Sequence, residues 1–286
     1  MIEYFDEAKS RAINLGQDSC SLEEWKKGGY KKYSCSWHPN KFLVFLHPDE
    51  LVGSDEYATE DPYAVSDHMT SNFHRRRFNC TLDLLKGVQG KGLKLLDIAC
   101  GEGHITAEIK KHFPKMEVLG LDYSTSAIDY AHKKYKGVTF FVADAHQLPF
   151  KDESLDIAIC NNIWEHVPDP LAMLKAISRV LKPGGLLIIS TPSRYRFSNL
   201  ARIARGKGVG FMSSYHVTEY SVGQVKEQLK YGGFQVKKIT STTIAERSPL
   251  SRLAKSFISL ILKLTKSDHI LESTAFYLAV KTSQSK

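Results

Sequence analysis

The sequence has no long hydrophobic run. Its most apolar stretch, residues 257–264, is far shorter than the roughly 18 to 20 residues that a membrane-spanning helix needs. The first residues are polar and acidic, unlike a secretory signal peptide, and no linker, low-complexity tract or internal repeat divides the 286 residues. We therefore expect a globular protein without a transmembrane segment, long enough for one large domain or for one domain with a sizeable cap.

Cysteine is scarce and odd in number, with five in the chain. A secreted disulfide framework usually has an even number, so we expect a reducing compartment and a cytoplasmic location. Cys20, Cys35 and His38 could suggest zinc, but their spacing fits no common set of zinc ligands. We therefore predict no zinc site among them.

Acidic residues are fewer than basic ones: the chain has 31 Asp and Glu and 39 Lys and Arg, which gives a net charge of +8. Such an excess favours anionic partners without choosing between nucleic acid, a membrane surface and acidic metabolites. The basic residues are spread along the chain, and no RNA-binding module is recognisable. We expect no nucleic-acid partner.

From residue 93 onward, short apolar runs alternate with helical patterns. Runs that are apolar at nearly every residue suit strands buried on both faces of a parallel sheet, with helices covering it. The expected strands are 94–99, 117–122, 138–143, 155–160, 185–190, 234–240 and 275–280. The expected helices are 105–112, 125–136, 170–181 and 221–231. The pattern predicts an α/β fold.

Two glycines follow the first of these strands. Gly101 and Gly103 lie between a strand and a helix, where glycines let the backbone turn and approach a ligand. Position 106 is Thr, where a dinucleotide fingerprint has Gly or Ala, and the Gly-Lys-Ser/Thr of a phosphate-binding loop is absent. The turn therefore argues against a nicotinamide-linked oxidoreductase and against a nucleotide phosphate.

Three successive strands each end at an acid: Asp97, Asp122 and Asp144. Parallel strands bring their carboxyl ends to one edge of the sheet, where open α/β sheets bind ligands. Carboxylates are poor neighbours for a pyrophosphate but suit a ligand that carries an ammonium and a sulfonium. Asp122, about 20 residues past the glycines, can bind both hydroxyls of a ribose. The pattern predicts a crevice for a cationic nucleoside.

Five motifs, in order, resemble those of the class I S-adenosylmethionine-dependent methyltransferases. They are LLDIACGEG (95–103), GLDYS (120–124), ADAHQLPF (143–150), NIWEHV (162–167) and LKPGG (181–185). The resemblance covers about residues 73–240 and is nearest to the small-molecule branch that includes ubiquinone and menaquinone methyltransferases. It implies a Rossmann-like sheet of seven strands, mostly parallel with an antiparallel last strand, in a domain of residues 73–286. Residues 1–72 would form an N-terminal extension or lid over the site.

The resemblance also implies roles, with S-adenosyl-L-methionine (SAM) as cofactor and S-adenosyl-L-homocysteine as product. The methionine part would lie on Asp97, Ala99, Cys100, Gly101 and Gly103. Asp122 would bind the ribose and Tyr123 the adenine face, while Asp144 and Ala145 would bind the adenine edge. Asn161 would face the methyl-transfer site, and Arg77 would add a cofactor contact.

Methyl transfer to a hydroxyl is helped by a general base. His166, which follows the fourth strand, is the first candidate, with His216 and His146 behind it. A structural role, hydrogen bonding to backbone at a helix start, is the alternative for His166. Glu165 alone does not supply a metal site, so we predict no metal.

Two insertions, near 193–215 and 245–272, should determine the acceptor. Arginines in the first could clamp an anionic group. The second contains a basic, amphipathic helical pattern at 251–266, which we expect to pack on its own domain, with a peripheral membrane contact as the alternative. We expect a small-molecule acceptor, anionic or lipid-like, and O- or C-methylation. The alternatives are a SAM-binding protein without transfer activity and an RNA methyltransferase. The sequence does not indicate the oligomeric state.

Overall fold

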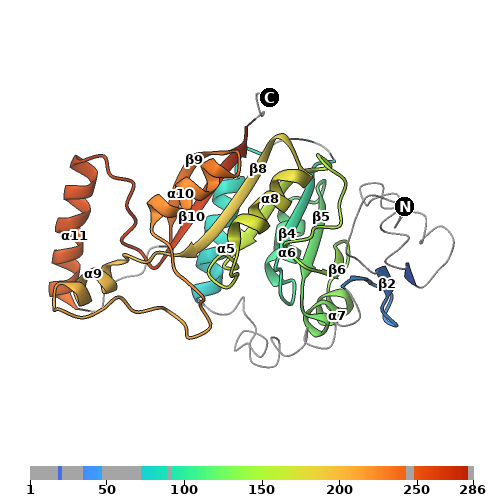
Figure 1. Ribbon diagram of the computed structural model, residues 1–286, viewed down its shortest axis with the longest axis horizontal. Helices are drawn as coiled ribbons and strands as arrows, with labels where there is room; N and C mark the ends of the chain where they lie inside the picture. The colour runs from blue at the N-terminus through green and yellow to red at the C-terminus, as the bar shows by residue number, and fades with distance from the viewer. Residues whose placement is uncertain are drawn as a thin grey trace.

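The computed structural model describes residues 19–20, 35–46, 72–88, 90, 92–242 and 248–282. Its centre is one mixed sheet with the strand order β1-β2-β3-β6-β5-β4-β7-β8-β10-β9 (Figure 1). The strands from the methyltransferase-like region are β4 (Lys94–Ile98), β5 (Glu117–Asp122), β6 (Thr139–Ala143), β7 (Leu155–Asn161), β8 (Leu181–Pro192), β9 (Phe234–Ser241) and β10 (Thr274–Lys281). Among these seven, β6, β5, β4, β7 and β8 are parallel neighbours, and β10 runs antiparallel to both β8 and β9. The expected α/β class and the antiparallel last strand are confirmed.

The central strands are buried on both faces because they are apolar at nearly every position. Successive residues point to opposite sides of a strand, so Leu95 packs into one cluster and its neighbour Leu96 into another. The same alternation divides Ile157 and Ile159 from Ala158. A continuous apolar run is therefore what a sheet between two helical layers requires.

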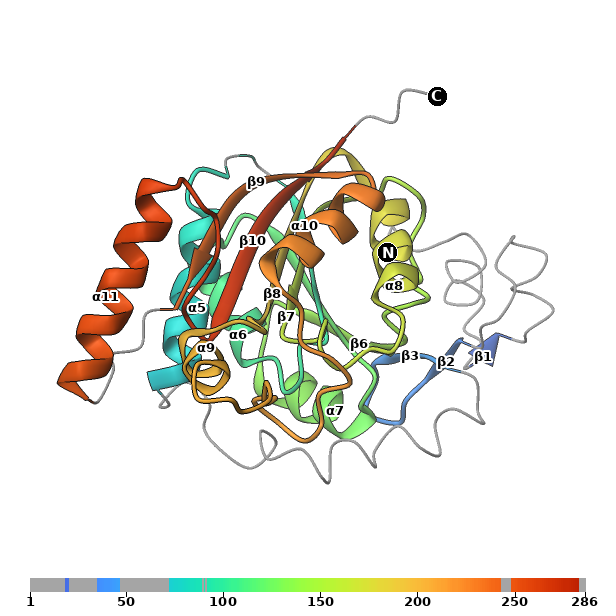
Figure 2. The ribbon, with the colours of Figure 1, turned by 60° about the vertical axis from the view of Figure 1, so that its left-hand side comes forward.

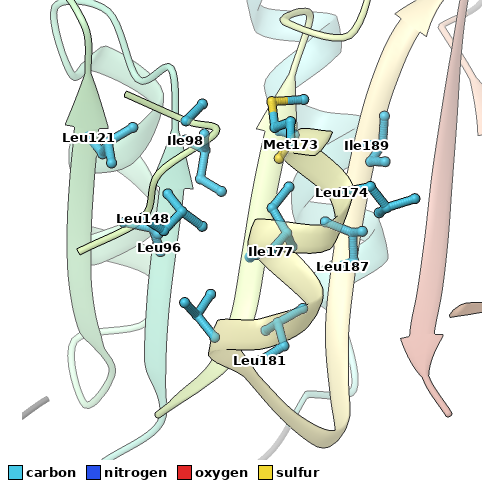
Figure 3. Packing of buried hydrophobic residues seen from close by; sticks show 14 of the residues in the cluster. Leu96, Ile98, Leu121, Leu148, Met173, Leu174, Ile177, Leu181, Leu187 and Ile189 are labelled. Atoms are coloured by element: carbon cyan, nitrogen blue, oxygen red, sulfur yellow. The ribbon is translucent and has the colours of Figure 1, made fainter. Parts of the chain in front are cut away.

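Helices cover both faces of this sheet (Figure 2). One face carries α5 (Asn72–Leu85), α6 (His104–His112) and α7 (Thr125–Lys134), whose buried residues pack with β4, β5 and β6. The other carries α8 (Pro170–Val180) and α10 (Val222–Tyr231). Met173, Leu174 and Ile177 of α8 pack on β4, β7 and β8 in the larger cluster (Figure 3).

Side-chain caps fix where several helices begin. Ser124 accepts a hydrogen bond from the Ala127 N–H at 3.2 Å, as expected for the start of α7. Asp169 caps α8 in the same way, and Ser221 forms a capping box with Gln224 at α10. Of these helices, α7 begins three residues after the end of β5, which places its first turn at the carboxyl edge of the sheet.

Three short strands extend the sheet beyond β6. They are β1 (Ser19–Cys20), β2 (Cys35–Trp37) and β3 (Leu43–Phe45). β3 pairs with β6 in parallel, and β2 pairs with both β3 and β1 in antiparallel fashion. The described part of the N-terminal extension thus adds to the sheet edge. The remainder of the expected lid, and the side chains of Cys20 and Cys35, lie outside the described residues.

The two expected insertions form helices at one end of the sheet. The first contains α9 (Phe197–Ile203), and the second contains α11 (Pro249–Leu264). Both views show α11 at the periphery, away from the sheet (Figures 1 and 2). We expected α11 to pack its apolar face on the domain, but none of its residues is buried. Of the described helices, none has the length and apolar character needed to cross a bilayer.

Candidate cofactor and acceptor site

The glycine-rich turn after β4 is held in a left-handed conformation at several residues. Ala99, Gly101 and Gly103 have φ of 58°, 53° and 74°. A Cβ added to Gly101 would meet nothing within 4 Å, so the backbone here is open to a ligand. A Cβ on Gly103 would lie 2.7 Å from the Phe140 ring. Gly103 therefore serves packing, whereas Gly101 offers the open approach that we expected of both glycines.

Asp122, at the end of β5, organises this turn. Its Oδ2 accepts a hydrogen bond from the Gly101 N–H at 2.7 Å, and its Oδ1 accepts one from the Ser124 N–H at 2.9 Å. One carboxylate thus links the glycine turn to the start of α7. A carboxylate oxygen can accept more than one hydrogen bond, as binding of ribose hydroxyls would require.

Asp97 is almost completely buried at the end of β4 and accepts a hydrogen bond from Thr106 Oγ1 at 2.6 Å. Burial, with the nearby Asp122 carboxylate, raises the pKa of Asp97 to about 7, against the opposing effects of Thr106 and Arg77. Arg77, on α5, is itself buried. The predicted methionine-side acid therefore lies within electrostatic reach of both Asp122 and Arg77.

The third acid follows the neighbouring strand. Asp144 Oδ1 accepts a hydrogen bond from the backbone N–H of His146 and lies 2.9 Å from its Nδ1. Burial alone would raise the pKa of Asp144, but the bonds with His146 lower it and raise that of His146. Since β4, β5 and β6 are adjacent, Asp97, Asp122 and Asp144 lie at one edge of the sheet. Tyr123 is 39% exposed beside them, and Ala145 is buried.

Two further predicted cofactor residues have structural partners. The Asn161 amide bonds to Thr81 of α5 at 3.2 Å and to Ser190 Oγ of β8 at 3.0 Å, which ties three elements together beneath the edge. Burial and the carboxylates of Asp122 and Asp97 raise the pKa of Cys100 well above its usual range. Cys100 is therefore a protonated packing residue and not a nucleophile.

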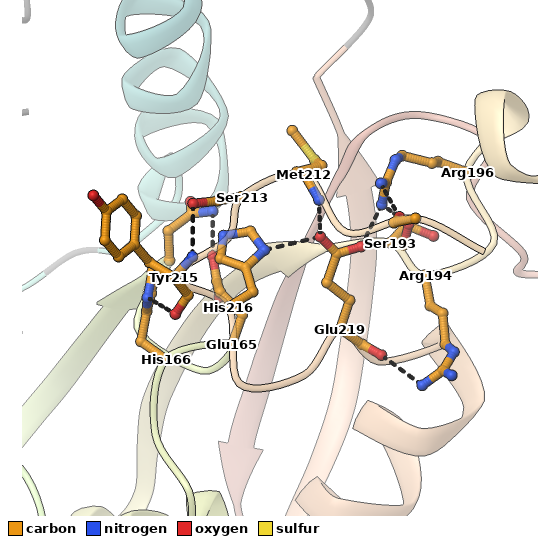
Figure 4. Close-up of polar contacts among 12 residues, drawn as sticks. Glu165, His166, Ser193, Arg194, Arg196, Met212, Ser213, Tyr215, His216 and Glu219 are labelled. Atoms are coloured by element: carbon orange, nitrogen blue, oxygen red, sulfur yellow. Dashed lines mark hydrogen bonds and ion pairs between the residues drawn. The ribbon is translucent and has the colours of Figure 1, made fainter. Parts of the chain in front are cut away.

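On the acceptor side, the structure brings His166 and His216 together. Their ring centroids lie 4.9 Å apart in an edge-to-face arrangement (Figure 4). His166 Nδ1 lies 3.2 Å from the Tyr215 carbonyl oxygen, and His216 Nδ1 lies 2.8 Å from Glu219 Oε1. Burial, with His216 nearby, lowers the pKa of His166 to about 4, so this imidazole is neutral at pH 7. His146, bonded to Asp144, is not part of this pair.

Glu219, which sequence reasoning did not single out, anchors the acceptor-side loop. It is fully buried, forms an ion pair with Arg196, accepts the Met212 N–H and contacts His216 (Figure 4). Burial alone would raise the pKa of Glu219, but these contacts lower it. Arg196 also donates to the carbonyls of Ser193 and Gly210. Arg196, one of the arginines expected to clamp an acceptor, is therefore used inside the loop.

Glu165 completes the cluster beneath the histidines. Its carbonyl accepts the N–H groups of Val217 and Thr218, and its Oε1 accepts a hydrogen bond from Asn162 at 2.9 Å. Oε2 is buried and has no hydrogen-bond partner among the described residues. Glu165, His166 and His216 each offer a ligand atom within 4.8 Å of the others, a set that could hold a metal ion after contraction. The predicted absence of a metal stays a prediction.

A family model described as a methyltransferase domain matches residues 89–248. The chain is 31% identical over 161 residues to the demethylmenaquinone methyltransferase of Thermotoga maritima, covering 50% of this chain and 70% of that protein. It is 32% identical over 174 residues to the malonyl-acyl-carrier-protein O-methyltransferase of Hahella chejuensis, covering 52% and 62%. The chain spans between 53% and 70% of the first three curated relatives it matches.

One similar solved structure comes from the complex between the Haloferax volcanii Trm112 methyltransferase activator and a methyltransferase. It superposes with a TM-score of 0.56 at 17% identity and covers 80% of this chain and 98% of that one. At this identity the likeness concerns the fold.

Proposed function

This chain belongs to the methyltransferase-domain family, in its class I SAM-dependent branch, and we propose that it transfers a methyl group to a hydroxyl of a small-molecule acceptor. The observation that carries the proposal is the alignment of two sites along one sheet edge. Carboxylates lie at or next to the carboxyl ends of β4, β5 and β6, and the two histidines of the pair come after β7 and after β8 in the chain.

The residues at the first three strand ends fit SAM. The open space at Gly101 admits a ligand close to the backbone, and Asp122 presents a carboxylate beside it. Asp97 would attract the cationic amino acid part, and Asp144 would accept from the adenine amino group. When bound, the cofactor supplies a methyl group already activated on a sulfonium.

The chain's own task is then to orient the acceptor and to receive its proton. Of the two histidines, we assign the proton to His216. Its Nδ1 is held by the Glu219 carboxylate, which leaves Nε2 with the ring's lone pair and stabilises the imidazolium that forms. A pKa of about 4 makes His166 a weak base, and we assign it a positioning role against His216. This reverses the order in which the sequence ranked them.

The test is SAM-dependent turnover on a panel of phenols and quinols, with release of S-adenosylhomocysteine as the readout. His216→Ala should lower turnover of a hydroxyl acceptor at least about 100-fold, and His166→Ala should lower it less. Neither should change SAM affinity measured by titration calorimetry, because the acids are unaltered. If turnover survives both substitutions, the assignment of the base to this histidine pair is wrong. SAM binding without turnover of any acceptor would favour a binding protein.

The same assay addresses metal dependence. We expect turnover to persist in the presence of a chelator. Two of the atoms that could bind a metal already have hydrogen-bond partners, because Glu165 bonds to Asn162 and His216 bonds to Glu219. Loss of turnover that a divalent ion restores would contradict the predicted absence of a metal.

A further inference from the structure

The surface of the helix α11 divides into three stripes of side chains, because residues spaced three and four apart lie on the same face of a helix. One stripe carries large apolar side chains: Leu250, Leu253, Phe257, Leu260, Ile261 and Leu264. A second, half-buried stripe carries Ser251, Lys255, Ile258 and Leu262. The remaining surface is polar and includes Arg252 and Lys263. The helix is therefore strongly amphipathic, and the question is which stripe faces the domain.

The stripe that faces the domain is not the most apolar one. Lys255 Nζ lies 2.8 Å from Glu272 Oε2, and both side chains are largely covered, which ties the second stripe to the segment leading into β10. The apolar stripe points away: Leu253 is 70% exposed and Phe257 is 64% exposed. The helix stands at the periphery in both views (Figures 1 and 2).

Such exposure of large apolar side chains along a whole helix is unusual for a protein surface in contact with water. Leu250 and Leu264, at opposite ends of α11, are 75% and 74% exposed, so the apolar stripe runs the length of the helix. Sixteen residues span about 24 Å. Monomeric proteins rarely leave a continuous apolar stripe of this length in water, and such surfaces mark interaction sites.

The charges on α11 are of one sign. The helix contains Arg252, Lys255 and Lys263, is followed by Lys266, and has no Asp or Glu. In an antiparallel pair of two identical helices, Arg252 would lie near Lys263 of the second copy with no carboxylate from α11 between them, which disfavours self-association. An anionic surface would instead meet both a cationic flank and an apolar stripe.

We propose that α11 lies flat on an anionic lipid bilayer, with its apolar stripe inserted at the level of the headgroups and the side chains of Arg252 and Lys263 reaching the lipid phosphates. Arg252 and Lys263 flank the apolar stripe and can extend their charged ends to the headgroups while their stems lie along the apolar surface. This docking does not depend on methyl transfer.

The experiment is co-sedimentation of the full chain with vesicles of phosphatidylcholine, with or without phosphatidylglycerol. The protein should sediment with the anionic vesicles and much less with the neutral ones. A variant with Leu253→Ser, Phe257→Ser and Leu260→Ser should lose at least about tenfold in partitioning. Arg252→Gln with Lys263→Gln should lose about tenfold on anionic vesicles only, and added salt should reproduce that loss.

The matched control is Tyr231→Ser, because Tyr231 is 68% exposed but lies on α10. It should bind vesicles as the unaltered chain does. All variants should keep their unfolding midpoint and SAM affinity, because the replaced side chains are exposed and none belongs to the residues assigned to the cofactor. The proposal is overturned if anionic vesicles do not bind, if Tyr231→Ser loses as much as the α11 variants, or if sedimentation velocity shows a dimer that the apolar variant dissolves.

Discussion

The cofactor side and the acceptor side of this molecule are built in different ways. At the cofactor side, each acid lies at or next to the end of its own strand. Asp122 and Asp144 accept hydrogen bonds from nearby backbone N–H groups, and Asp97 accepts one from the Thr106 hydroxyl. At the acceptor side, Glu219 joins Arg196, 23 residues earlier, to Met212 and His216 through buried side-chain contacts. The first site rests on the sheet, and the second rests on one buried carboxylate. This difference predicts where substitutions cost stability and where they cost binding.

The largest expected effect is on the acceptor side. Glu219→Ala should lower the free energy of unfolding by about 3 to 5 kcal/mol, because it leaves the buried Arg196 guanidinium without its carboxylate. Urea unfolding followed by circular dichroism measures this. Asp268→Ala, which breaks the exposed pair with Lys226, is the control and should cost less than about 1 kcal/mol. Equal losses in the two variants would contradict the central role of Glu219.

A pair of glycine substitutions sharpens the comparison within the cofactor side. Gly103→Ala should cost about 2 to 4 kcal/mol of stability, because its Cβ would overlap the Phe140 ring and the left-handed backbone disfavours alanine. Gly101→Ala should cost only about 1 to 2 kcal/mol, from the backbone alone. In titration calorimetry, however, Gly101→Ala should bind SAM more weakly than Gly103→Ala when the two variants are compared under conditions where they are equally folded. The reverse ranking would show that Gly103 faces the ligand.

The pH dependence of SAM binding tests the protonation state of the Asp97 carboxyl group. Its pKa is raised to about 7 in the cofactor-free protein, so below pH 7 the carboxyl is protonated and must lose a proton to attract a cation. Affinity should therefore fall by up to about tenfold for each pH unit below 7. Calorimetric titrations across this range should show the slope in the unaltered chain and a flat response in Asp97→Asn. A flat response in both would place Asp97 away from the cofactor.

Much of the cofactor side follows from the sequence. The strand predicted at 117–122 is β5 with the same bounds, and the helix predicted from residue 125 begins there, capped by Ser124. Such elements are predictable because burial on both faces demands an unbroken apolar run, and because a cap acts over three residues. Adjacent parallel strands then place the three acids at one edge without further information.

The acceptor side does not follow in this way. The contacts of Glu219 with Arg196 and His216 join residues of a loop that has no period, so no local pattern marks Glu219 as buried. The orientation of α11 was predicted wrongly for a related reason. Its spacing shows that one stripe is apolar but contains no information on whether the domain or something else covers it.

The central claim is that carboxylates at the ends of β4, β5 and β6 bind a cationic nucleoside. Asp122→Ala tests it most directly, by calorimetric titration with SAM and, in parallel, with NADH. We predict that the unaltered chain binds SAM and not NADH, and that the substitution weakens SAM binding at least about tenfold, the loss of one charge-assisted hydrogen bond. Unchanged SAM affinity in Asp122→Ala, or NADH binding by the unaltered chain, would contradict the account.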